Sequence, residues 1–324
     1  MTGGGDRPHV AVIGAGAWGT ALALQAARAG ARVRLWARDP GSLDSHRRMA
    51  RLPGVVLPDD ITVDALLPDA ADLVLLAVPM QHLRDIAGRL TVRAPLIACC
   101  KGLERASLML PGEVLRELHP EHPHGVLSGP NFAGEVARGL PAAAVLACHD
   151  QALATALARM LSTAAFRLYA GDDPVGVEAG AAAKNVIAIA AGAAMGSGAG
   201  ENARAALITR GIAELGRLIT ALGGRRETAA GLSGIGDLVL TCTGPGSRNY
   251  SLGVQLGQGT PLRDILGARS TVTEGVETAP ALAERAARLG VRVPIIEAVA
   301  ALLTGRIDLA EARDRLLSRP IGSE

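Results

Sequence analysis

Short apolar runs alternate with segments of helical period over the first half of the chain. The runs are rich in Val, Leu and Ala without polar alternation, and they lie at residues 9–13, 32–37, 72–78, 95–100, 125–128, 142–148 and 166–170. Strands of this kind are buried on both faces, and helical connections between them imply parallel pairing. The pattern therefore predicts an α/β fold built on a doubly wound parallel sheet.

The pattern changes at Asp173 and Pro174, because an acidic residue followed by proline is typical of the start of a helix. Almost everything beyond this point has helical composition, with helices expected at residues 175–195, 203–222, 247–258, 276–289, 294–303 and 309–317. We therefore predict three parts, which are a disordered N-terminal tail at residues 1–8, an α/β domain at 9–173 and an all-α domain at 174–324.

Composition excludes several classes of protein. The 324 residues include 33 Lys and Arg against 31 Asp and Glu, with 2 Trp, 2 Tyr and 2 Phe. This leaves little basic charge or stacking surface for nucleic acid. The longest apolar run, residues 186–194, is shorter than the roughly 18 residues that span a bilayer. We recognise no signal peptide, and four cysteines without CxxC spacing favour reduced thiols, so we expect a cytoplasmic protein that does not span a membrane.

A glycine-rich motif, GAGAWG, directly follows the first predicted strand and opens a helix that ends at Gly30. Gly14 permits a tight turn, Gly16 lets the backbone approach a pyrophosphate, and Gly19 lets the helix pack on the strand. The phosphates would face unpaired amides at the helix N-terminus. Because strand, turn, helix and second strand occur in this order, the motif predicts a dinucleotide-binding site.

The end of the second predicted strand bears on the choice of dinucleotide. It reads Trp36-Ala37-Arg38-Asp39, with no acidic residue before the turn to bind a ribose 2′-hydroxyl. Arg38 stands where a guanidinium can pair with a 2′-phosphate, which favours NADPH, and Asp39 keeps NADH possible. The alternative for Arg38 is an ordinary solvated arginine.

Two lysines are candidates for chemistry. Lys184 is the only charged residue between Glu178 and Glu201. It either extends to solvent or is partly desolvated, and desolvation would lower its pKa toward the range of a proton donor. Lys101 follows a predicted strand, at the sheet edge where open α/β folds bind ligands, although a lysine in water explains that position equally well.

Two loops and a histidine cluster complete the candidates. In the loop SGPNFA, Asn131 can cap the following helix, and capping alone would explain that loop. In the loop GPGSRN, the helix amides with Arg248 and Asn249 would hold a phosphate, unless Ser247 is simply an N-cap. The histidines of HPEHPHG are separated by prolines that favour an extended chain, so we assign no metal site.

With GAGAWGTA, Lys101-Gly102, SGPNFA, Lys184-Asn185-Val186, GLSGIGDLVLTCT and SRNYSLG in this order, the chain resembles the bacterial NAD(P)-dependent glycerol-3-phosphate dehydrogenases from about residue 9 to 317. The resemblance implies a Rossmann domain followed by a helical domain, and a homodimer. It also implies interconversion of dihydroxyacetone phosphate and sn-glycerol 3-phosphate for glycerophospholipid synthesis. Two other interpretations remain, a two-domain dehydrogenase of a hydroxy acid or sugar nucleotide and a non-catalytic dinucleotide sensor.

The same resemblance assigns roles to residues, with Lys184 as the proton donor or acceptor at the substrate C2 oxygen. It implies substrate contacts at Lys101, Gly129, Asn131, Lys184, Asp237, Ser247, Arg248 and Asn249. Asp237 and Ser247 would either hold substrate hydroxyls or orient Lys184. It implies cofactor contacts at Gly14, Gly16, Ala17, Trp18, Gly19, Arg38, Lys101, Ala133, Arg248, Val272 and Glu274. Asn131 departs from the family pattern, which usually has a small hydroxyl residue there. We expect the Lys184 amine to lie in the crevice between the domains.

Overall fold

The computed structural model describes residues 7–40, 44, 47–49, 51–269 and 273–318. The chain divides into two compact units, Met1–Cys100 with Pro111–Pro174 and Lys101–Leu110 with Val175–Glu324. The sequence pattern placed residues 101–110 in the first domain. The structure groups them with the second unit because Leu103, Leu108 and Leu110 belong to its hydrophobic core. Within the predicted tail at residues 1–8, residues 1–6 lie outside the described residues.

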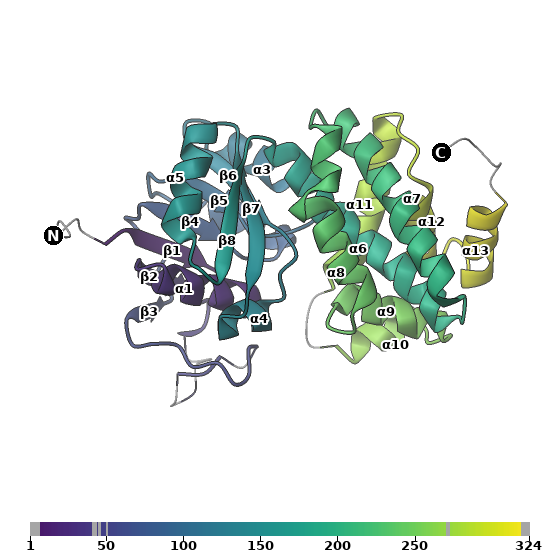
Figure 1. The fold of residues 1–324 in the computed structure, drawn as a ribbon, viewed down its shortest axis with the longest axis horizontal. Helices are drawn as coiled ribbons and strands as arrows, with labels where there is room; N and C mark the ends of the chain where they lie inside the picture. Colours follow the sequence, from purple (N-terminus) through teal and green to yellow (C-terminus); the bar gives the residue numbers. More distant parts are fainter. Residues whose placement is uncertain (1–6, 41–43, 45–46, 50, 270–272, 319–324) are drawn as a thin grey trace. The chain divides into compact units, whose positions relative to one another are not determined.

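The first unit is built on one sheet, which has eight strands in the part of the chain that is described (Figure 1). Their spatial order is β3-β2-β1-β4-β5-β6-β7-β8. The strands are β1 (His9–Ile13), β2 (Arg32–Trp36), β3 (Ile61–Asp64), β4 (Leu73–Leu76), β5 (Leu96–Ala98), β6 (His124–Ser128), β7 (Ala142–Cys148) and β8 (Phe166–Gly171). The predicted α/β architecture is confirmed.

The parallel pairing predicted for this sheet is wrong for one pair. β6 and β7 run antiparallel, with Ser128 opposite Val145. Between them the chain forms only α4 (Ala133–Arg138), a helix of six residues. A parallel return needs a crossover that runs back along the sheet, usually as a longer helix, and the short α4 brings the chain back beside β6 in the opposite direction instead.

The sequence pattern also misses β3, which lies at the edge of the sheet beside β2. Ile61 is buried and Thr62 is exposed, so β3 alternates in the manner of a half-covered strand. The other strands were found as runs without polar alternation. A pattern of continuous apolar runs therefore does not reveal this four-residue strand.

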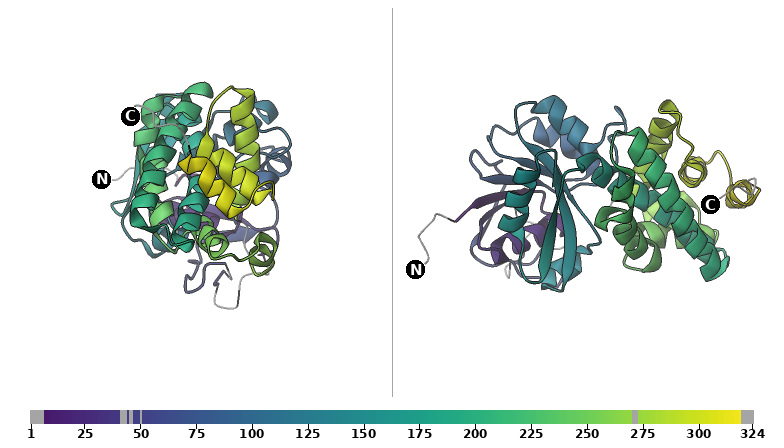
Figure 2. Two further views of the ribbon diagram at one scale, coloured as in Figure 1. Left: turned by 90° about the vertical axis from the view of Figure 1, so that its right-hand side faces the viewer. Right: turned by 45° about the horizontal axis from the view of Figure 1, so that its top comes forward.

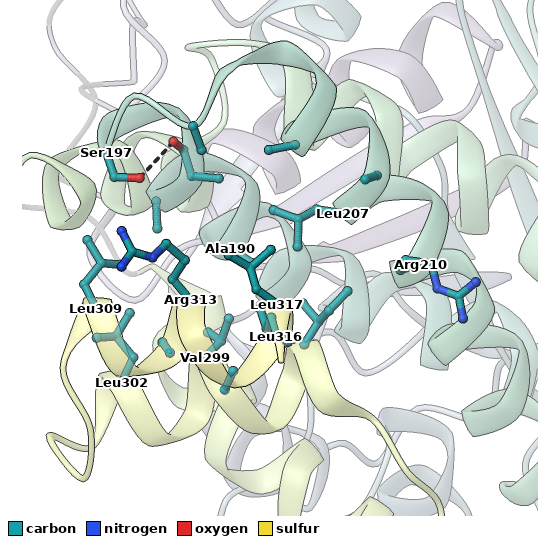
Figure 3. Close-up of a pocket in the computed structure, with 18 of the residues that line it drawn as sticks. Ala190, Ser197, Leu207, Arg210, Val299, Leu302, Leu309, Arg313, Leu316 and Leu317 are labelled. Atoms are coloured by element: carbon teal, nitrogen blue, oxygen red, sulfur yellow. Dashed lines mark hydrogen bonds between the residues drawn. The ribbon is translucent and has the colours of Figure 1, made fainter. Parts of the chain in front are cut away.

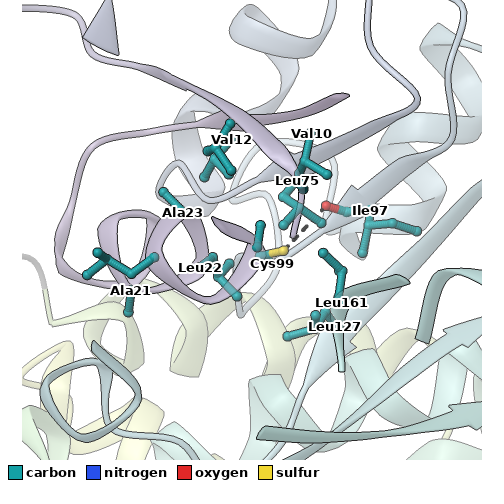
Figure 4. Close-up of a cluster of buried hydrophobic side chains, with 14 of the residues drawn as sticks. Val10, Val12, Ala21, Leu22, Ala23, Leu75, Ile97, Cys99, Leu127 and Leu161 are labelled. Carbon is teal, nitrogen blue, oxygen red and sulfur yellow. Dashed lines mark hydrogen bonds between the residues drawn. The ribbon is translucent and has the colours of Figure 1, made fainter. Parts of the chain in front are cut away.

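Small side chains let α1 (Ala17–Arg28) pack closely on the sheet. Its residues 19–26 are all buried, and Figure 4 shows Leu22 and Ala23 in one cluster with Val10 and Leu75. This packing fixes the end of β1 relative to the start of α1, where the glycine-rich turn lies. The remaining α-helices described in this unit are α2 (Leu83–Ala87), α3 (Pro111–Leu118) and α5 (Gln151–Leu161).

The regular secondary structure described in the second unit is all helical (Figure 2), and its first segment, Lys101–Leu110, forms no helix or strand. Its α-helices are α6 (Pro174–Gly196), α7 (Gly200–Ala221), α8 (Asp237–Thr243), α9 (Arg248–Gly257), α10 (Leu262–Gly267), α11 (Glu274–Arg288), α12 (Pro294–Leu303) and α13 (Leu309–Leu317). The last two have the predicted bounds, and four more lie within a few residues of prediction. The sequence pattern misses α8 and α10, because helices of seven and six residues complete too few turns to show a period.

The long apolar helix α6 forms the centre of the second unit. It is long and apolar enough to cross a membrane, but 83% of its most apolar stretch is buried inside the protein. Ala183, Val186 and Ile187 are completely buried among the other helices. α6 is therefore a core helix, and Lys184 lies in the middle of it.

Glycines bring α6 and α9 into close contact. A Cβ atom on Gly192 of α6 would overlap the carbonyl oxygen of Tyr250, and one on Gly253 of α9 would overlap that of Ile189. Neither helix can carry a larger residue at these positions without moving apart. The contact places the first turn of α9, which follows Ser247, beside the middle of α6.

Candidate active site

The GAGAWG motif forms a tight turn between β1 and α1. Gly14 has φ of 116°, which favours glycine, and its amide donates to the carbonyl oxygen of Trp36 over 3.1 Å. A Cβ atom there would lie 2.8 Å from the carbonyl oxygen of Ala77, and one on Gly19 would overlap the carbonyl of Gly14. These two glycines are therefore required by the turn itself.

The space in front of this turn suits an anion. Gly16 is the N-cap of α1 and offers no side chain to the first amides, and a Cβ atom on it would meet nothing within 4 Å. Uncapped amides facing open space are the arrangement in which a helix N-terminus binds phosphate. Ala17 and Trp18 begin the helix, and the buried Trp18 Nε1 has no hydrogen-bond partner among the described residues. Arg38 is exposed just beyond β2.

The loop SGPNFA is held by a different contact from the helix cap that the sequence predicted. Asn131 does not cap α4, because the N-cap is Phe132 without a side-chain hydrogen bond. Instead, Asn131 Nδ2 donates to the carbonyl oxygen of Ala143 over 3.2 Å. A Cβ atom on Gly129 would lie 2.8 Å from Ala144 Cα, so β7 leaves room only for glycine. Ala133, the first residue of α4, is half-buried.

Polar atoms in this loop remain available for a ligand. Asn131 Oδ1 and Ser128 Oγ are buried and have no hydrogen-bond partner in the described part of the chain. Buried polar atoms without partners are uncommon in proteins, because desolvating them costs free energy. The unsatisfied groups of the first unit therefore include Trp18, Ser128 and Asn131, which lie in or beside residues predicted to bind ligands.

In the second unit, two ammonium groups share one carboxylate. Lys184 Nζ, on α6, donates to Asp237 Oδ1 over 2.5 Å, and Lys101 Nζ donates to Asp237 Oδ2 over 2.8 Å. The side chains of Lys184, Lys101 and Asp237 are 8%, 15% and 1% exposed. Of the two alternatives for Lys184, extension to solvent and desolvation, the structure shows desolvation.

The charges of this cluster shift one another. Burial lowers the pKa of the Lys184 ammonium to about 8, with the attraction of Asp237 opposing the shift and the repulsion of Lys101 adding to it. Burial also acts to lower the pKa of Lys101, but the nearby Asp237 outweighs it and raises that pKa. Burial acts to raise the pKa of Asp237, and the two ammonium groups hold it below its usual value. Of the two ammonium groups, that of Lys184 thus gives up its proton more readily.

Thr241 and Asn185 belong to the same cluster and were not assigned from the sequence. Thr241 lies one turn beyond Asp237 on α8, and its hydroxyl donates to the Asp237 carbonyl oxygen over 2.6 Å while accepting from Lys184 Nζ at 3.1 Å. Asn185 Oδ1 accepts from Asn249 Nδ2 over 2.9 Å. The available signal for Thr241 was its spacing of four residues from Asp237, and the signal for Asn185 was its position next to Lys184.

A chain of amides links α6 to α9 and α11. Asn185 Nδ2 donates to Glu274 Oε2 over 3.3 Å, and the amide of Gly275 donates to Asn249 Oδ1 over 3.0 Å. Ser247 caps α9, with its Oγ accepting from the amide of Tyr250. These contacts bring the expected residues Asn249 and Glu274 next to the residue that follows Lys184.

Not every expected residue joins this cluster. Arg248 is exposed at the first position of α9, and Val272 lies outside the described residues. The expected residues of GAGAWG and SGPNFA, with Arg38, belong to the first unit.

The number of lysines is a further signal of this site in the sequence. The printed sequence contains only two lysines, Lys101 and Lys184, so 31 of the 33 basic residues are arginine. Both lysines bind the same carboxylate. Lysine differs from arginine in that its pKa shifts readily on burial, which suits proton transfer.

A separate hollow of about 1080 Å³ lies between α7, α12 and α13 (Figure 3). Leu207, Val299 and Leu316 point into it, and its charged lining residues include Arg210 and Arg313. Neither lysine lines it. We place the candidate chemistry at the lysine cluster, because Glu214, the buried carboxylate that lines the hollow, already accepts from the amides of Ile295 and Ile296.

Comparison with known proteins decides the family. The model of the NAD-dependent glycerol-3-phosphate dehydrogenase N-terminus matches residues 9–154, and that of the C-terminus matches residues 173–314. The chain belongs to the NAD-dependent glycerol-3-phosphate dehydrogenase family. The resemblance drawn from the sequence motifs is confirmed.

Individual members of the glycerol-3-phosphate dehydrogenase family match over nearly the whole chain. Glycerol-3-phosphate dehydrogenase [NAD(P)+] of Gluconobacter oxydans is 57% identical, covering 97% of this chain and 98% of its own. The Caulobacter vibrioides protein of the same name is 51% identical with the same coverage. The crystal structure of the Coxiella burnetii glycerol-3-phosphate dehydrogenase superposes with a TM-score of 0.91 at 35% identity, covering 97% of this chain and 99% of that one.

Proposed function

We propose that this chain catalyses the reversible reduction of dihydroxyacetone phosphate to sn-glycerol 3-phosphate with NADPH, and that NADH can substitute. The observation that carries the proposal is the buried Lys184 ammonium held by Asp237, in a chain of this family. A membrane role has no support from α6, which is buried in the second unit.

Lys184 supports the proposed reduction as a proton donor. Reduction of the ketone develops negative charge on its oxygen, and an ammonium within hydrogen-bond reach stabilises that charge and supplies the proton. Asp237 and Thr241 take two of the three N–H groups of Lys184. One N–H remains for the substrate oxygen. With a pKa of about 8, Lys184 can both donate this proton and recover it near neutral pH.

The first turn of α9 is proposed to hold the substrate phosphate. Arg248 offers an exposed guanidinium, Asn249 an amide, and Ser247 lies at the helix N-terminus. Guanidinium groups and helix amides bind phosphate well. Because dihydroxyacetone phosphate is small, these contacts would supply much of the binding that orients the ketone. Gly129 and Asn131 are proposed to contribute from the first unit.

The GAGAWG turn is proposed to hold the pyrophosphate of the cofactor, and Arg38 its 2′-phosphate. The open space at Gly16 and the unpaired Trp18 Nε1 fit such a group. When bound, the reduced nicotinamide supplies the hydride. Further cofactor contacts are proposed at Lys101, Ala133, Arg248, Val272 and Glu274 on the basis of the family resemblance.

The cellular setting is also proposed from the family resemblance. We infer a cytoplasmic homodimer whose product feeds glycerophospholipid synthesis. Light scattering on the purified protein tests the dimer, because a mass equal to that of one chain would contradict it.

The direct test of function follows the absorbance of the reduced nicotinamide with dihydroxyacetone phosphate and each cofactor in turn. Oxidation of NADPH with this substrate, and much slower oxidation with unphosphorylated dihydroxyacetone, is the expected result. Turnover only with a keto acid or a sugar nucleotide would support another two-domain dehydrogenase instead. Cofactor binding without turnover of any of these would support a sensor.

A further inference from the structure

One arginine, Arg269, joins three segments of the second unit. One terminal nitrogen of its guanidinium donates to the carbonyl oxygen of Arg248 over 2.8 Å and to Thr273 Oγ1 over 3.3 Å. The other donates to Ser251 Oγ over 3.1 Å and to Gln255 Oε1 over 3.3 Å. The residue itself follows α10 and is half-buried.

These bonds tie the start of α9 to the start of α11. Arg248, Ser251 and Gln255 belong to α9, and Thr273 is the N-cap of α11. The same two helices meet again where Gly275 donates to Asn249, as described above. Arg269 therefore supports the segment on which the proposed phosphate-binding residues lie.

The geometry requires an arginine. The four acceptors lie on two helices, and a planar guanidinium presents its donors in a fixed fork. A lysine has one nitrogen and cannot reach acceptors on both sides. All four acceptors are neutral oxygens, so the positive charge of Arg269 adds to that of Arg248 at the N-terminus of α9.

We propose that Arg269 is a positioning residue for the substrate phosphate. Arg269 acts by fixing the backbone of Arg248, and with it Asn249, against the start of α11. The inference rests on the proposed function, since it assigns the phosphate to the first turn of α9. Arg269 is not among the residues that the sequence motifs or the family resemblance assigned.

The test compares a phosphorylated and an unphosphorylated substrate in three variants of the full chain. Arg269→Gln removes the fork and the charge, and Arg269→Lys keeps only the charge. Arg263→Gln is the matched control, because Arg263 lies on the preceding helix, is 87% exposed and pairs only with the neighbouring Asp264 in the described contacts.

For Arg269→Gln we expect kcat/KM for dihydroxyacetone phosphate to fall about tenfold or more, mainly through KM, since a lost charged hydrogen-bond network is of that order. Activity on unphosphorylated dihydroxyacetone should stay within about twofold, because no phosphate is involved. Arg269→Lys should lose nearly as much as Arg269→Gln, and Arg263→Gln should match the parent chain. Competitive inhibition by inorganic phosphate should weaken in parallel.

Two results would overturn the inference. Equal losses on both substrates in Arg269→Gln and Arg269→Lys would show a merely structural role. Unchanged KM in both variants would show no role at all. Absence of activity on dihydroxyacetone phosphate in the parent chain would instead overturn the proposed function.

Discussion

The ammonium of Lys184 lies 2.5 Å from Oδ1 of Asp237, in a polar cluster enclosed by the aliphatic core of the second unit. The second oxygen of the same carboxylate is taken by Lys101. The three side chains together carry one net positive charge, which Glu274 partly offsets at Lys101. Such a charge is costly to bury, and it would be offset when negative charge develops on a substrate oxygen.

Replacing Lys184 tests proton donation. We expect Lys184→Ala to lower kcat by about 10²- to 10⁴-fold, the usual contribution of a general acid. Lys184→Arg should also be impaired, because a guanidinium keeps the charge but does not release its proton. NADPH affinity, measured by fluorescence titration, should change little in both variants. Turnover near that of the parent chain in Lys184→Ala would remove this residue from the mechanism.

Replacing Asp237 by Asn tests the electrostatic coupling. The attraction of Asp237 raises the pKa of Lys184 against the effect of burial, so its loss should move that pKa further down. The reduction needs protonated Lys184, and its rate should therefore begin to fall at a lower pH in Asp237→Asn. The pH dependence of kcat measures this shift.

The same variant should be less stable. Breaking a buried ion pair usually costs about 3–5 kcal/mol, because the remaining charges lose their partner. Urea unfolding measures the loss. An unchanged pH profile together with unchanged stability would contradict the coupling described here.

Replacing Gly192 tests the close contact between α6 and α9. A methyl group there would overlap the carbonyl oxygen of Tyr250, so we expect Gly192→Ala to destabilise the protein by about 1–3 kcal/mol. Gly267→Ala is the matched control, because a Cβ atom at Gly267 meets nothing within 4 Å. That change should be neutral or stabilise by up to about 1 kcal/mol. Thermal unfolding of both variants gives the comparison, and equal midpoints would argue against the contact.

His124, at the start of β6, should make the free energy of unfolding depend on pH. Burial lowers its pKa, and the positive charge of Arg116 adds to this effect. The unfolded chain then binds more protons below about pH 6.5, so stability should fall as the pH drops through that value. In His124→Gln the urea midpoint should fall less steeply with decreasing pH than in the parent chain. Replacing the exposed His82 should leave this pH dependence unchanged. If the urea midpoint of His124→Gln falls with pH as steeply as that of the parent chain, His124 does not contribute to this pH dependence.

Much of the fold was visible in the sequence. Central strands such as β1 and β7, and the helices α12 and α13, have the predicted bounds, because long uniform patterns identify them. The antiparallel direction of β7 was not visible, since only the chain path through α4 sets it. The edge strand β3 was missed because its four residues do not form a continuous apolar run.

The candidate site was predictable only as a set of residues. The sequence allowed Lys184 either to extend to solvent or to be desolvated. Burial by helices distant in the sequence decides between these alternatives. The family resemblance gave Asp237 as a residue that could orient Lys184, but nothing predicted that Lys101 binds the same carboxylate. Tertiary packing sets that contact, because it brings α6 and α8 together with the segment that follows β5. The presence of only two lysines was a usable signal, since arginine serves every other basic position.

The scarcity of lysine also permits the most direct test of the central claim, which is that Lys184 is a buried ammonium ready to give up its proton. Nuclear magnetic resonance of protein labelled at the lysine side chains should show only two lysine signals. We predict that one titrates with a pKa of about 8 and that the other, from Lys101, titrates above the usual value for lysine. Two signals that titrate together at the usual value for lysine would contradict the account.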